Sequence, residues 1–476
     1  MSLIIPANTL ASGGYAVDNS LRFNRGSSDS LQRTPSGAGN RRTFTFSCWV
    51  KKTTNSAGEA MELFDSPTYS GGANRDGLRF ETANHLRFFI NNASSGDFAT
   101  NRLFRDVSAW SHIVLAVDTT QKTASNRVKI YINGVQETSF STETQPSQNY
   151  DLQFNTTGIH SIGFFQNDSG ELFSGYMSEV VLIDGQQLDA TSFGEFDEDS
   201  GIWKPINVSG LTFGTNGFYL DFEDSGALGA DVSGNTNNFT VNNLTAIDQT
   251  TDTPTNNFAT LNPLNAYNAT TIAGISEGNL SIGGTASDGG VTSTIGVSSG
   301  KWYWEEKVIT GADTAPVTGV LNTLGANSVK VSTTQSRTSG SGFWGFYNNT
   351  GSGNGIMENG TATGRFIDSL YSDNEIAMFA IDVDAQKIWY GKNGTWFSSG
   401  NPATGANASS TNLTANDTWF AYRENRSGYT TIFNFGNAPY TISSGNTDGN
   451  DRGNFEYAPP SGYLSLCTAN LSEVLG

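Results

Sequence analysis

Positive charge is scarce in this sequence, and so is charge of either sign. Only 15% of the 476 residues are charged, and 45 acidic against 26 basic residues give a formal net charge of -19. A protein that binds nucleic acid needs a basic surface to displace counterions from phosphates, and anionic membranes attract basic segments. The composition therefore argues against nucleic acid as a partner and against electrostatic attachment to a membrane.

Long apolar runs and cysteines are also rare. The longest apolar runs, at 113–117 and 180–183, fall far short of the roughly 20 residues that cross a bilayer, so we expect no membrane insertion. Residues 1–10 lack a positively charged start, which predicts no secretory signal and assembly in a host cytoplasm. Cys48 and Cys467 are too few for a disulfide framework, and the apolar run around Cys48 predicts a buried thiol.

Extended helical patterns are missing, and strand patterns take their place. The 54 glycines and the 12% of aromatic residues are typical of many short strands joined by turns. Asn133-Gly134 and Asn393-Gly394 predict hairpins, because a type I′ turn needs positive φ at both central residues. We expect an all-β fold with two antiparallel jelly-roll or β-sandwich domains and, at most, a short helix near 189–196. Apolar and polar residues alternate with the two-residue period of a strand at 43–50, 86–90, 128–132 and 301–308.

Composition divides the chain into two strand-rich regions with an irregular connector between them. We expect a jelly roll at 20–205 and a β sandwich at 266–440. The connector, 206–265, is rich in Asn, Thr and Asp, yet it carries too many aromatic residues for a disordered linker. Both ends of the chain are apolar, so 1–19 is predicted to be an assembly segment and 441–476 a tail that docks on neighbouring subunits.

Motifs in both regions resemble known β-sandwich families. In the first region, Phe44-Thr-Phe-Ser-Cys-Trp-Val is similar to an early core strand of a laminin-G-like, concanavalin-A-like jelly roll. Trp110-Ser-His-Ile-Val-Leu-Ala-Val with Val128-Lys-Ile-Tyr-Ile-Asn-Gly resembles its paired central strands, and Phe173-Ser-Gly-Tyr-Met-Ser-Glu-Val-Val-Leu-Ile its closing strand. The second region resembles a SPRY-type sandwich at Gly300-Lys-Trp-Tyr-Trp-Glu-Glu-Lys-Val, at 373–389, at Gly391-Lys-Asn-Gly-Thr-Trp and at Thr430-Thr-Ile-Phe-Asn-Phe-Gly.

The combination of the two domains, their connector and the short apolar start is similar to virion proteins of bacteriophages, particularly marine ones. This resemblance implies a non-enzymatic role on the virion surface, as a tail fibre or related appendage that recognises host-surface glycans. It also implies other virion proteins as partners, and we expect a homo-oligomer, for example a trimer. Two alternatives stay open: a purely structural capsid decoration or tail component that binds no sugar, and, more remotely, a β-glucan hydrolase.

Patterns that carry chemistry are few. Glu195-Phe-Asp197-Glu-Asp199 approaches the alternating carboxylates of retaining β-glucanases, but it ends in Asp, and we expect a solvated acidic turn. Gly296-Val-Ser-Ser-Gly matches the string of a nucleophile elbow, but a strand pattern follows it where the elbow needs a helix, so it predicts a hairpin turn. His112 fits a strand pattern and is expected to be a hydrogen-bonded core residue.

Two acidic loops are candidate calcium sites, because calcium prefers oxygen ligands from loops. The structural alternative for both loops is that the Asx side chains bond their own backbone. One candidate site consists of Asp224, Asp231 and Asn235, and the other of Asp448, Asn450 and Asp451.

Aromatic residues offer a further kind of site, since sugar rings stack on aromatic faces while polar side chains bond their hydroxyls. We predict Trp344, Tyr347, Tyr422 and Arg423 as surface residues that recognise a glycan. In a strand, about half of such residues face the core by alternation alone.

Overall fold

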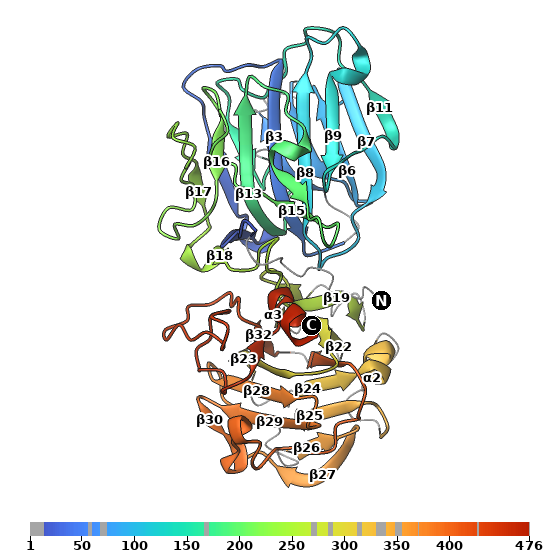
Figure 1. The fold of residues 1–476 in the computed structure, drawn as a ribbon, viewed down its shortest axis with the longest axis vertical. Coiled ribbons are helices and arrows are strands. Elements are labelled where there is room, and N and C mark those ends of the chain that lie inside the picture. Colours follow the sequence, from blue (N-terminus) through green and yellow to red (C-terminus); the bar gives the residue numbers. More distant parts are fainter. Residues whose placement is uncertain are drawn as a thin grey trace. The chain divides into compact units, whose positions relative to one another are not determined.

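The computed structural model divides the chain into two compact units, one ending at Asn256 and the other beginning at Asn257. Strands dominate both units and the helices are short, so the predicted all-β fold with antiparallel β-sandwich units is confirmed (Figure 1). The described residues are 14–55, 60–66, 74–165, 171–267, 274–283, 289–311, 317–329, 339–347, 355–369, 371–425 and 428–475.

The first unit is a sandwich of two eight-stranded antiparallel sheets. One sheet has the strand order β10 (Val135–Gln136), β9 (Val128–Ile132), β8 (Ser111–Asp118), β3 (Thr43–Lys52), β13 (Gly175–Asp184), β1 (Ser20–Phe23) and β18 (Gln249–Thr250), with β16 (Phe218–Leu220) also paired to β13. The other has the order β11 (Phe140–Thr144), β7 (Gly96–Leu103), β6 (His85–Ile90), β5 (Asp76–Phe80), β4 (Met61–Ser66), β12 (His160–Ile162), β2 (Ser30–Arg33) and β17 (Thr240–Asn242).

The core of the first unit lies between these sheets, where alternate side chains of the strands are apolar. Phe46 of β3 and Phe64 of β4 stack with their ring centroids 4.6 Å apart, and Phe154 stacks on Phe64 at 4.7 Å. Cys48 belongs to the same core and is fully buried, which confirms the predicted buried thiol. Because burial disfavours the thiolate, it raises the pKa of Cys48.

Both Asn-Gly pairs form the predicted turns. Asn133 and Gly134, between β9 and β10, have φ values of 50° and 81°. Asn393 and Gly394 have φ values of 46° and 81° and join β29 (Lys387–Lys392) to β30 (Thr395–Trp396). Positive φ at both positions is what a type I′ hairpin turn requires, and it sets the register of each hairpin.

A second apolar layer packs on the other face of the sheet that contains β3, β8 and β13. The chain after β13 supplies it through η3 (Ala190–Ser192), β14 (Gly194–Phe196) and β15 (Trp203–Pro205), so the short helix predicted near 189–196 is a single 3₁₀ turn followed by a strand. His112 lies in this layer, where its Nε2 is 2.8 Å from Ser47 Oγ and its Nδ1 accepts a hydrogen bond from Trp203 Nε1 at 3.0 Å. The prediction of a hydrogen-bonded core histidine is confirmed.

The segment predicted to be a connector belongs largely to the first unit. Its strands β16, β17 and β18 pair with β13, β2 and β1, and its residues Phe218 and Phe239 lie in the core of this unit. The unit therefore extends to Asn256 and does not end near residue 205. Strands of two or three residues are too short to produce a recognisable alternation in the sequence, which explains the misplaced boundary.

The second unit is also built of two antiparallel sheets. Its seven-stranded sheet has the order β19 (Leu261–Ala266), β22 (Gly289–Val297), β31 (Trp419–Asn425), β24 (Val317–Asn322), β25 (Phe343–Tyr347), β26 (Gly355–Glu358) and β27 (Thr361–Phe366). Its eight-stranded sheet has the order β20 (Ile275–Ser276), β21 (Ser281–Gly283), β32 (Thr430–Asn434), β23 (Lys301–Thr310), β28 (Ile376–Asp382), β29 and β30, with β33 (Leu464–Ser465) paired in parallel to β23.

The C-terminal segment packs on its own unit. Besides β33, its residues Tyr463, Leu466 and Leu471 are buried in the cores of the second unit. The apolar side chains on which the prediction of a docking tail at 441–476 rests are therefore covered by the chain's own second unit. Of the predicted assembly segment, residues 1–13 lie outside the described residues, and the Val17 backbone N–H donates to Thr255 Oγ1 at 3.0 Å.

Helices contribute little to either unit. Among the described residues, no helix is both long and apolar enough to cross a membrane. The remaining helical elements are η1 (Arg25–Ser27), η2 (Ala124–Asn126), η4 (Ala246–Asp248), α2 (Thr323–Ser328), η8 (Phe397–Ser399), η9 (Pro402–Thr404) and α3 (Thr468–Leu475).

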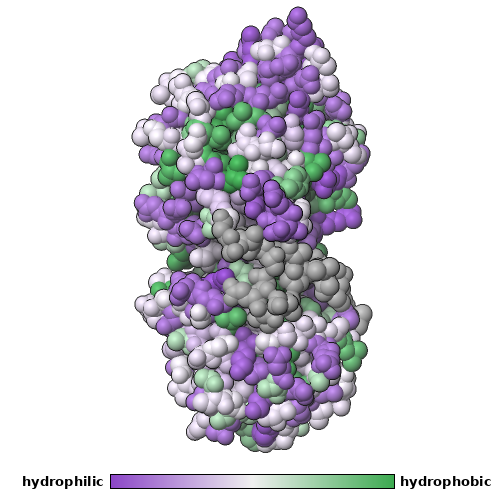
Figure 2. Space-filling view, in the orientation of Figure 1, coloured by the Kyte–Doolittle hydropathy of each residue, from purple (hydrophilic) through white to green (hydrophobic). Residues whose placement is uncertain are grey.

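On the face drawn in Figure 2, hydrophobic residues form small patches among hydrophilic and neutral ones.

Candidate functional site

The aromatic residues predicted to bind a glycan lie mostly inside the second unit. Trp344 is 3% exposed, Tyr422 is 1% exposed, and Tyr347 is half-buried. Trp344 faces the core between the two sheets, whereas Tyr422 and Tyr347 belong to an apolar cluster that includes Val329, next to α2. The expectation that these side chains form an exposed rim is corrected, because both faces of the sheet are covered at Trp344 and Tyr422.

Arg423, the fourth predicted ligand-binding residue, is an internal charge. Its side chain is 1% exposed, and its Nη1 lies 2.8 Å from Oε1 of the equally buried Glu306 on β23. Two hydroxyl groups also donate hydrogen bonds to the Glu306 carboxylate: Thr318 Oγ1 to Oε2 at 2.5 Å and Thr431 Oγ1 to Oε1 at 2.8 Å. This arrangement makes Arg423 a structural partner of Glu306 and not a surface recognition residue.

The first acidic loop uses its polar side chains to bond its own backbone. Asp231 accepts hydrogen bonds from the backbone N–H groups of Tyr219 and Ser233 at 2.9 Å and from that of Asn237 at 2.7 Å. Asp224 accepts from the backbone N–H of Gly226, and Asn235 donates to backbone carbonyls. The bonds from Gly226 and Ser233 are the Asx-turn alternative named above, whereas the bonds that involve Tyr219 and Asn235 join the loop to the chain around β16.

The second acidic loop is satisfied in the same way. Asp448 accepts from the backbone and hydroxyl of Ser465, from the side chain of Asn470 and from the backbone of Asn450. Within the part of the chain that the structure describes, no three His, Cys, Asp or Glu side chains are grouped to hold a metal ion. Calcium stays a prediction, and a melting temperature lowered by chelator would support it.

The carboxylates of the glucanase-like string lie at a two-stranded hairpin. Glu195 belongs to β14, and Asp197 begins the turn that leads to β15. Lys204 Nζ lies 3.1 Å from Asp197 and 3.4 Å from Glu195. Hydrogen bonds from Ser200 and Lys204 lower the pKa of Asp197 to about 2, which keeps this carboxylate ionised. Glu195, Glu198 and Asp199 are exposed, as in the solvated acidic turn that the sequence predicts, whereas Asp197 is buried.

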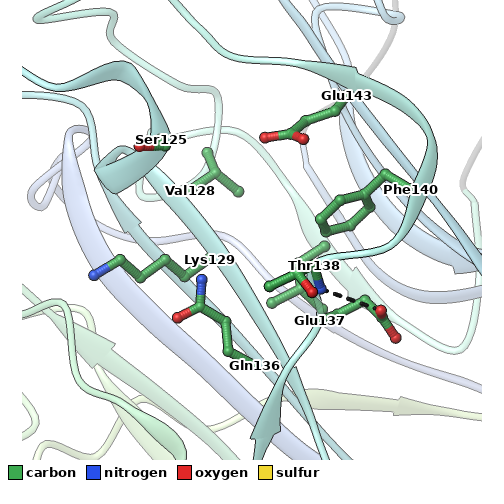
Figure 3. Close-up of a pocket in the computed structure, with 9 residues that line it drawn as sticks. Ser125, Val128, Lys129, Gln136, Glu137, Thr138, Phe140 and Glu143 are labelled. Atoms are coloured by element: carbon green, nitrogen blue, oxygen red, sulfur yellow. Dashed lines mark hydrogen bonds between the residues drawn. The ribbon is translucent and has the colours of Figure 1, made fainter.

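A pocket of about 200 Å³ opens in the first unit, at the side where the edge strands of its two sheets approach each other. Phe140 and Glu143 come from β11, the edge of one sheet, whereas Val128 and Lys129 come from β9 next to the edge of the other. Figure 3 shows the Phe140 ring and the Glu143 carboxylate extending toward Val128 across the opening. The lining residues are Ser125, Val128, Lys129, Ile130, Gln136, Glu137, Thr138, Phe140 and Glu143.

The floor of this pocket is apolar and rigid. Val128 and Ile130 are buried in the core of the sandwich. Phe140 is half-buried and packs edge-to-face on Phe98, with ring centroids 6.1 Å apart. An aromatic ring that is fixed by the core and partly open to solvent presents an apolar surface at little entropic cost.

The rim of the pocket is polar, and its two carboxylates differ. Glu137 is buried, and its oxygens are occupied by Arg102 Nε at 2.9 Å and by the backbone N–H groups of Thr138 and Ser139. Glu143 is exposed and accepts one side-chain hydrogen bond, from Gln145 at 3.1 Å. Glu137 therefore holds the chain that connects β10 to β11, whereas Glu143 keeps lone pairs for a ligand.

The pocket was missed by the sequence prediction because its residues come from two sheets. The one signal that could have indicated it is the aromatic Phe140 at the start of the otherwise polar run Phe140–Thr144, after the hairpin at Asn133-Gly134. The positions of β11 and β9 near the same side of the sandwich cannot be read from the sequence, because each depends on the order and register of the other strands in its own sheet.

Comparison with known families places the pocket in a matched region. Residues 25–190 match the Concanavalin A-like lectin/glucanases superfamily. This match agrees with the laminin-G-like, concanavalin-A-like fold of the first unit. A comparison with curated proteins gives no match.

Solved structures similar to the chain include a SPRY domain and laminin LG domains. The SPRY domain of human HERC1 is 17% identical, covers 36% of this chain and 96% of its own, and has a TM-score of 0.28. A heptameric SAP-like pentraxin from Limulus polyphemus is 16% identical, with 36% and 78% coverage and a TM-score of 0.27. Domains LG4-5 of the mouse laminin α1 chain are 9% identical, with 89% and 90% coverage and a TM-score of 0.29.

Proposed function

We propose that the first unit binds carbohydrate, without catalysis, in the pocket between β9, β10 and β11. The observation that carries this proposal is the combination of a half-buried aromatic ring, Phe140, with the exposed polar side chains of Gln136 and Glu143 around a single pocket. A sugar has an apolar C–H face and a ring of hydroxyls, so it needs a flat apolar surface and polar partners at its edge.

The size and charge of the pocket suit a single sugar residue of a glycan. About 200 Å³ is smaller than the roughly 300–1,000 Å³ of sites for drug-sized ligands. The Glu143 carboxylate accepts hydrogen bonds from hydroxyls, and the Gln136 amide both donates and accepts. In Figure 3 the Lys129 ammonium group extends away from Phe140, so its aliphatic stem is what faces the pocket. The family match, whose description includes lectins, supports the same ligand class.

A glycan array probed with the full chain, followed by calorimetric titration of the sugars that bind, tests this proposal. We expect Gln136→Ala and Glu143→Gln to weaken binding by about tenfold each, since each removes one hydrogen-bonding group worth about 1.4 kcal/mol. Glu223→Gln is the matched control, because Glu223 is also exposed and lies outside the pocket. Unchanged affinity in both pocket variants would contradict the proposal.

The biological setting is a further part of the proposal. We infer from the sequence resemblance that the chain is a virion surface protein of a bacteriophage, a tail fibre or a related appendage, and that the glycan is on the host surface. Other virion proteins and further copies of the chain would be its partners. Cryo-electron microscopy of the parent particle tests this: density for the first unit with the Phe140 pocket open to solvent supports attachment. A pocket closed by neighbouring subunits would favour a purely structural component.

A further inference from the structure

We propose that Phe196 is a second sugar-stacking position, and that the ligand of the first unit is therefore an oligosaccharide of several residues rather than a single terminal sugar. This inference rests on the proposed function and names the ligand class for it. Phe196 lies on β14, is not among the residues that line the Phe140 pocket, and is 50% exposed.

The Phe196 ring is held by the indole of Trp203. The two rings meet edge-to-face with their centroids 4.9 Å apart. Trp203 itself is 7% exposed and is fixed by its hydrogen bond to His112. Cross-strand pairing of Phe196 with Trp203 in the β14–β15 hairpin completes the support. Phe196 is thus a rigid aromatic surface, which is the feature that sugar stacking needs.

The same indole touches the hairpin that leads into the pocket. Gly134 lies so close to the Trp203 ring that a β-carbon there would come within 2.3 Å of it. Gln136, which lines the pocket, is two residues further along β10, or about 7 Å at the rise of a strand. Trp203 therefore contacts both sites. Phe196 packs on its indole, and the turn at Gly134, which precedes the strand that carries Gln136, lies against the same ring.

Polar side chains lie near the second aromatic position as well. Beside Phe196, the side chains of Glu195 and Lys204 are 58% and 22% exposed and lie 3.4 Å apart at their charged groups. Lys204 is shared with Asp197 at 3.1 Å, so these groups offer hydroxyls several acceptors and one donor and keep a net negative charge. A glycan that stacks on Phe140 at one end and on Phe196 at the other passes Gln136, which lies two residues from the turn that contacts Trp203.

The experiment measures affinity against chain length. Oligosaccharides of one to eight residues, from the polysaccharide that scores highest on the array, are titrated into the full chain by calorimetry. We expect affinity to rise with length until both aromatic positions are occupied. We expect Phe196→Ala to lower the affinity for the longest oligosaccharide by about tenfold, the loss of one aromatic contact, and to leave the shortest ligand that binds unchanged. Phe366→Ala is the matched control, since Phe366 is 55% exposed and belongs to the second unit.

The outcomes separate this inference from the proposed function. If no sugar binds at any length, the proposed function fails. If short sugars bind and Phe196→Ala has no effect on long ones, the proposed function stands and the oligosaccharide inference is overturned. Size-exclusion chromatography with light scattering is run on both proteins to test the other occupant of an exposed aromatic, a second copy of the chain. Wild-type self-association that Phe196→Ala abolishes would also overturn the inference.

Discussion

The ammonium group of Lys51 lies 2.6 Å from a carboxylate oxygen of Asp252, and both side chains are fully buried. Lys51 belongs to the central strand β3, whereas Asp252 is 201 residues later in the chain. The other carboxylate oxygen accepts a hydrogen bond from Trp110 Nε1 at 3.1 Å. This buried pair attaches the end of the first unit to the middle of its sheet.

Breaking this pair should destabilise the first unit strongly. We expect Asp252→Asn to lower the free energy of unfolding by roughly 3–5 kcal/mol, because it leaves Lys51 buried without an opposite charge. Urea denaturation followed by tryptophan fluorescence measures the change. The double variant Lys51→Met with Asp252→Asn should recover part of the loss. If the loss of unfolding free energy in the double variant equals the sum of the losses in Lys51→Met and in Asp252→Asn, a direct interaction between the two residues is contradicted.

The tight hairpin at Gly134 gives a second prediction. Gly134→Ala places a β-carbon at a residue with φ of 81° and within 2.3 Å of the Trp203 ring. Gly234→Ala is the matched control, because Gly234 has φ of 91° but faces open space. We expect the control to lose about 1–2 kcal/mol from backbone strain and Gly134→Ala to lose roughly 1–3 kcal/mol more from the clash. Equal melting temperatures for the two variants would show that Trp203 does not pack on the turn.

The pH dependence of stability should contain a contribution from Glu179. This residue of β13 has φ of 51°, is 5% exposed and accepts a hydrogen bond from the Tyr219 hydroxyl at 2.8 Å. Burial raises the pKa of Glu179 from 4.5 to about 7. The folded protein thus binds the proton more tightly than the unfolded chain, so this contribution is fully present below pH 4.5 and is lost as pH rises through 7.

Glu179→Gln tests this contribution, because glutamine stays neutral and still accepts the tyrosine hydrogen bond. We expect the difference in unfolding free energy between variant and wild type to shift by roughly 3 kcal/mol in favour of the variant between pH 4.5 and pH 8. Asp65, whose pKa burial raises to about 7, changes in the same direction but is present in both proteins and cancels. A difference that does not vary with pH would contradict the raised pKa.

Arg423 should matter for stability and not for glycan binding. Arg423→Ala leaves Glu306 as a buried carboxylate without its counter-charge, so we expect the second unit to lose roughly 3–5 kcal/mol. Arg423→Ala with Glu306→Gln should be less damaging than Arg423→Ala alone. Calorimetric titration at a temperature where the variant is folded should give the wild-type glycan affinity. A glycan affinity lost with Arg423 would return this residue to the ligand-binding role that the sequence predicts.

The fold class could be read from the sequence because alternation and turn chemistry are local. The alternating run at Thr43–Lys52 and the Asn-Gly turns each specify their structure within a few residues. The boundary after residue 205 could not be read, because β16, β17 and β18 acquire their role only through partners far away in the chain. The apolar C-terminal segment was predicted to be a docking tail for the same reason, since hydrophobicity does not tell which surface covers it.

The candidate site was predicted less well than the fold. Trp344 and Tyr422 look like recognition residues in the sequence because aromatic residues beside polar loops serve both cores and ligand sites. Whether a strand has one covered face or two depends on the layers around it, and here both faces are covered. Phe140 and Phe196 are partly open, but Phe140 stands in a segment with no distinctive motif, and Phe196 stands in a string noticed only for its carboxylates.

The strand β33 has a consequence for the order in which the chain folds during translation. β32 pairs with β23 from Glu305 onward, and β33 pairs with β23 at Trp302 and Tyr303, where β32 does not reach. The first unit has all its strands once Asn256 has left the ribosome. The second unit keeps an open edge beside Trp302 until Ser465 has emerged. The nascent chain therefore carries a finished first unit while its second sandwich is still incomplete, and that open edge is where a chaperone or an early misfolding event would act.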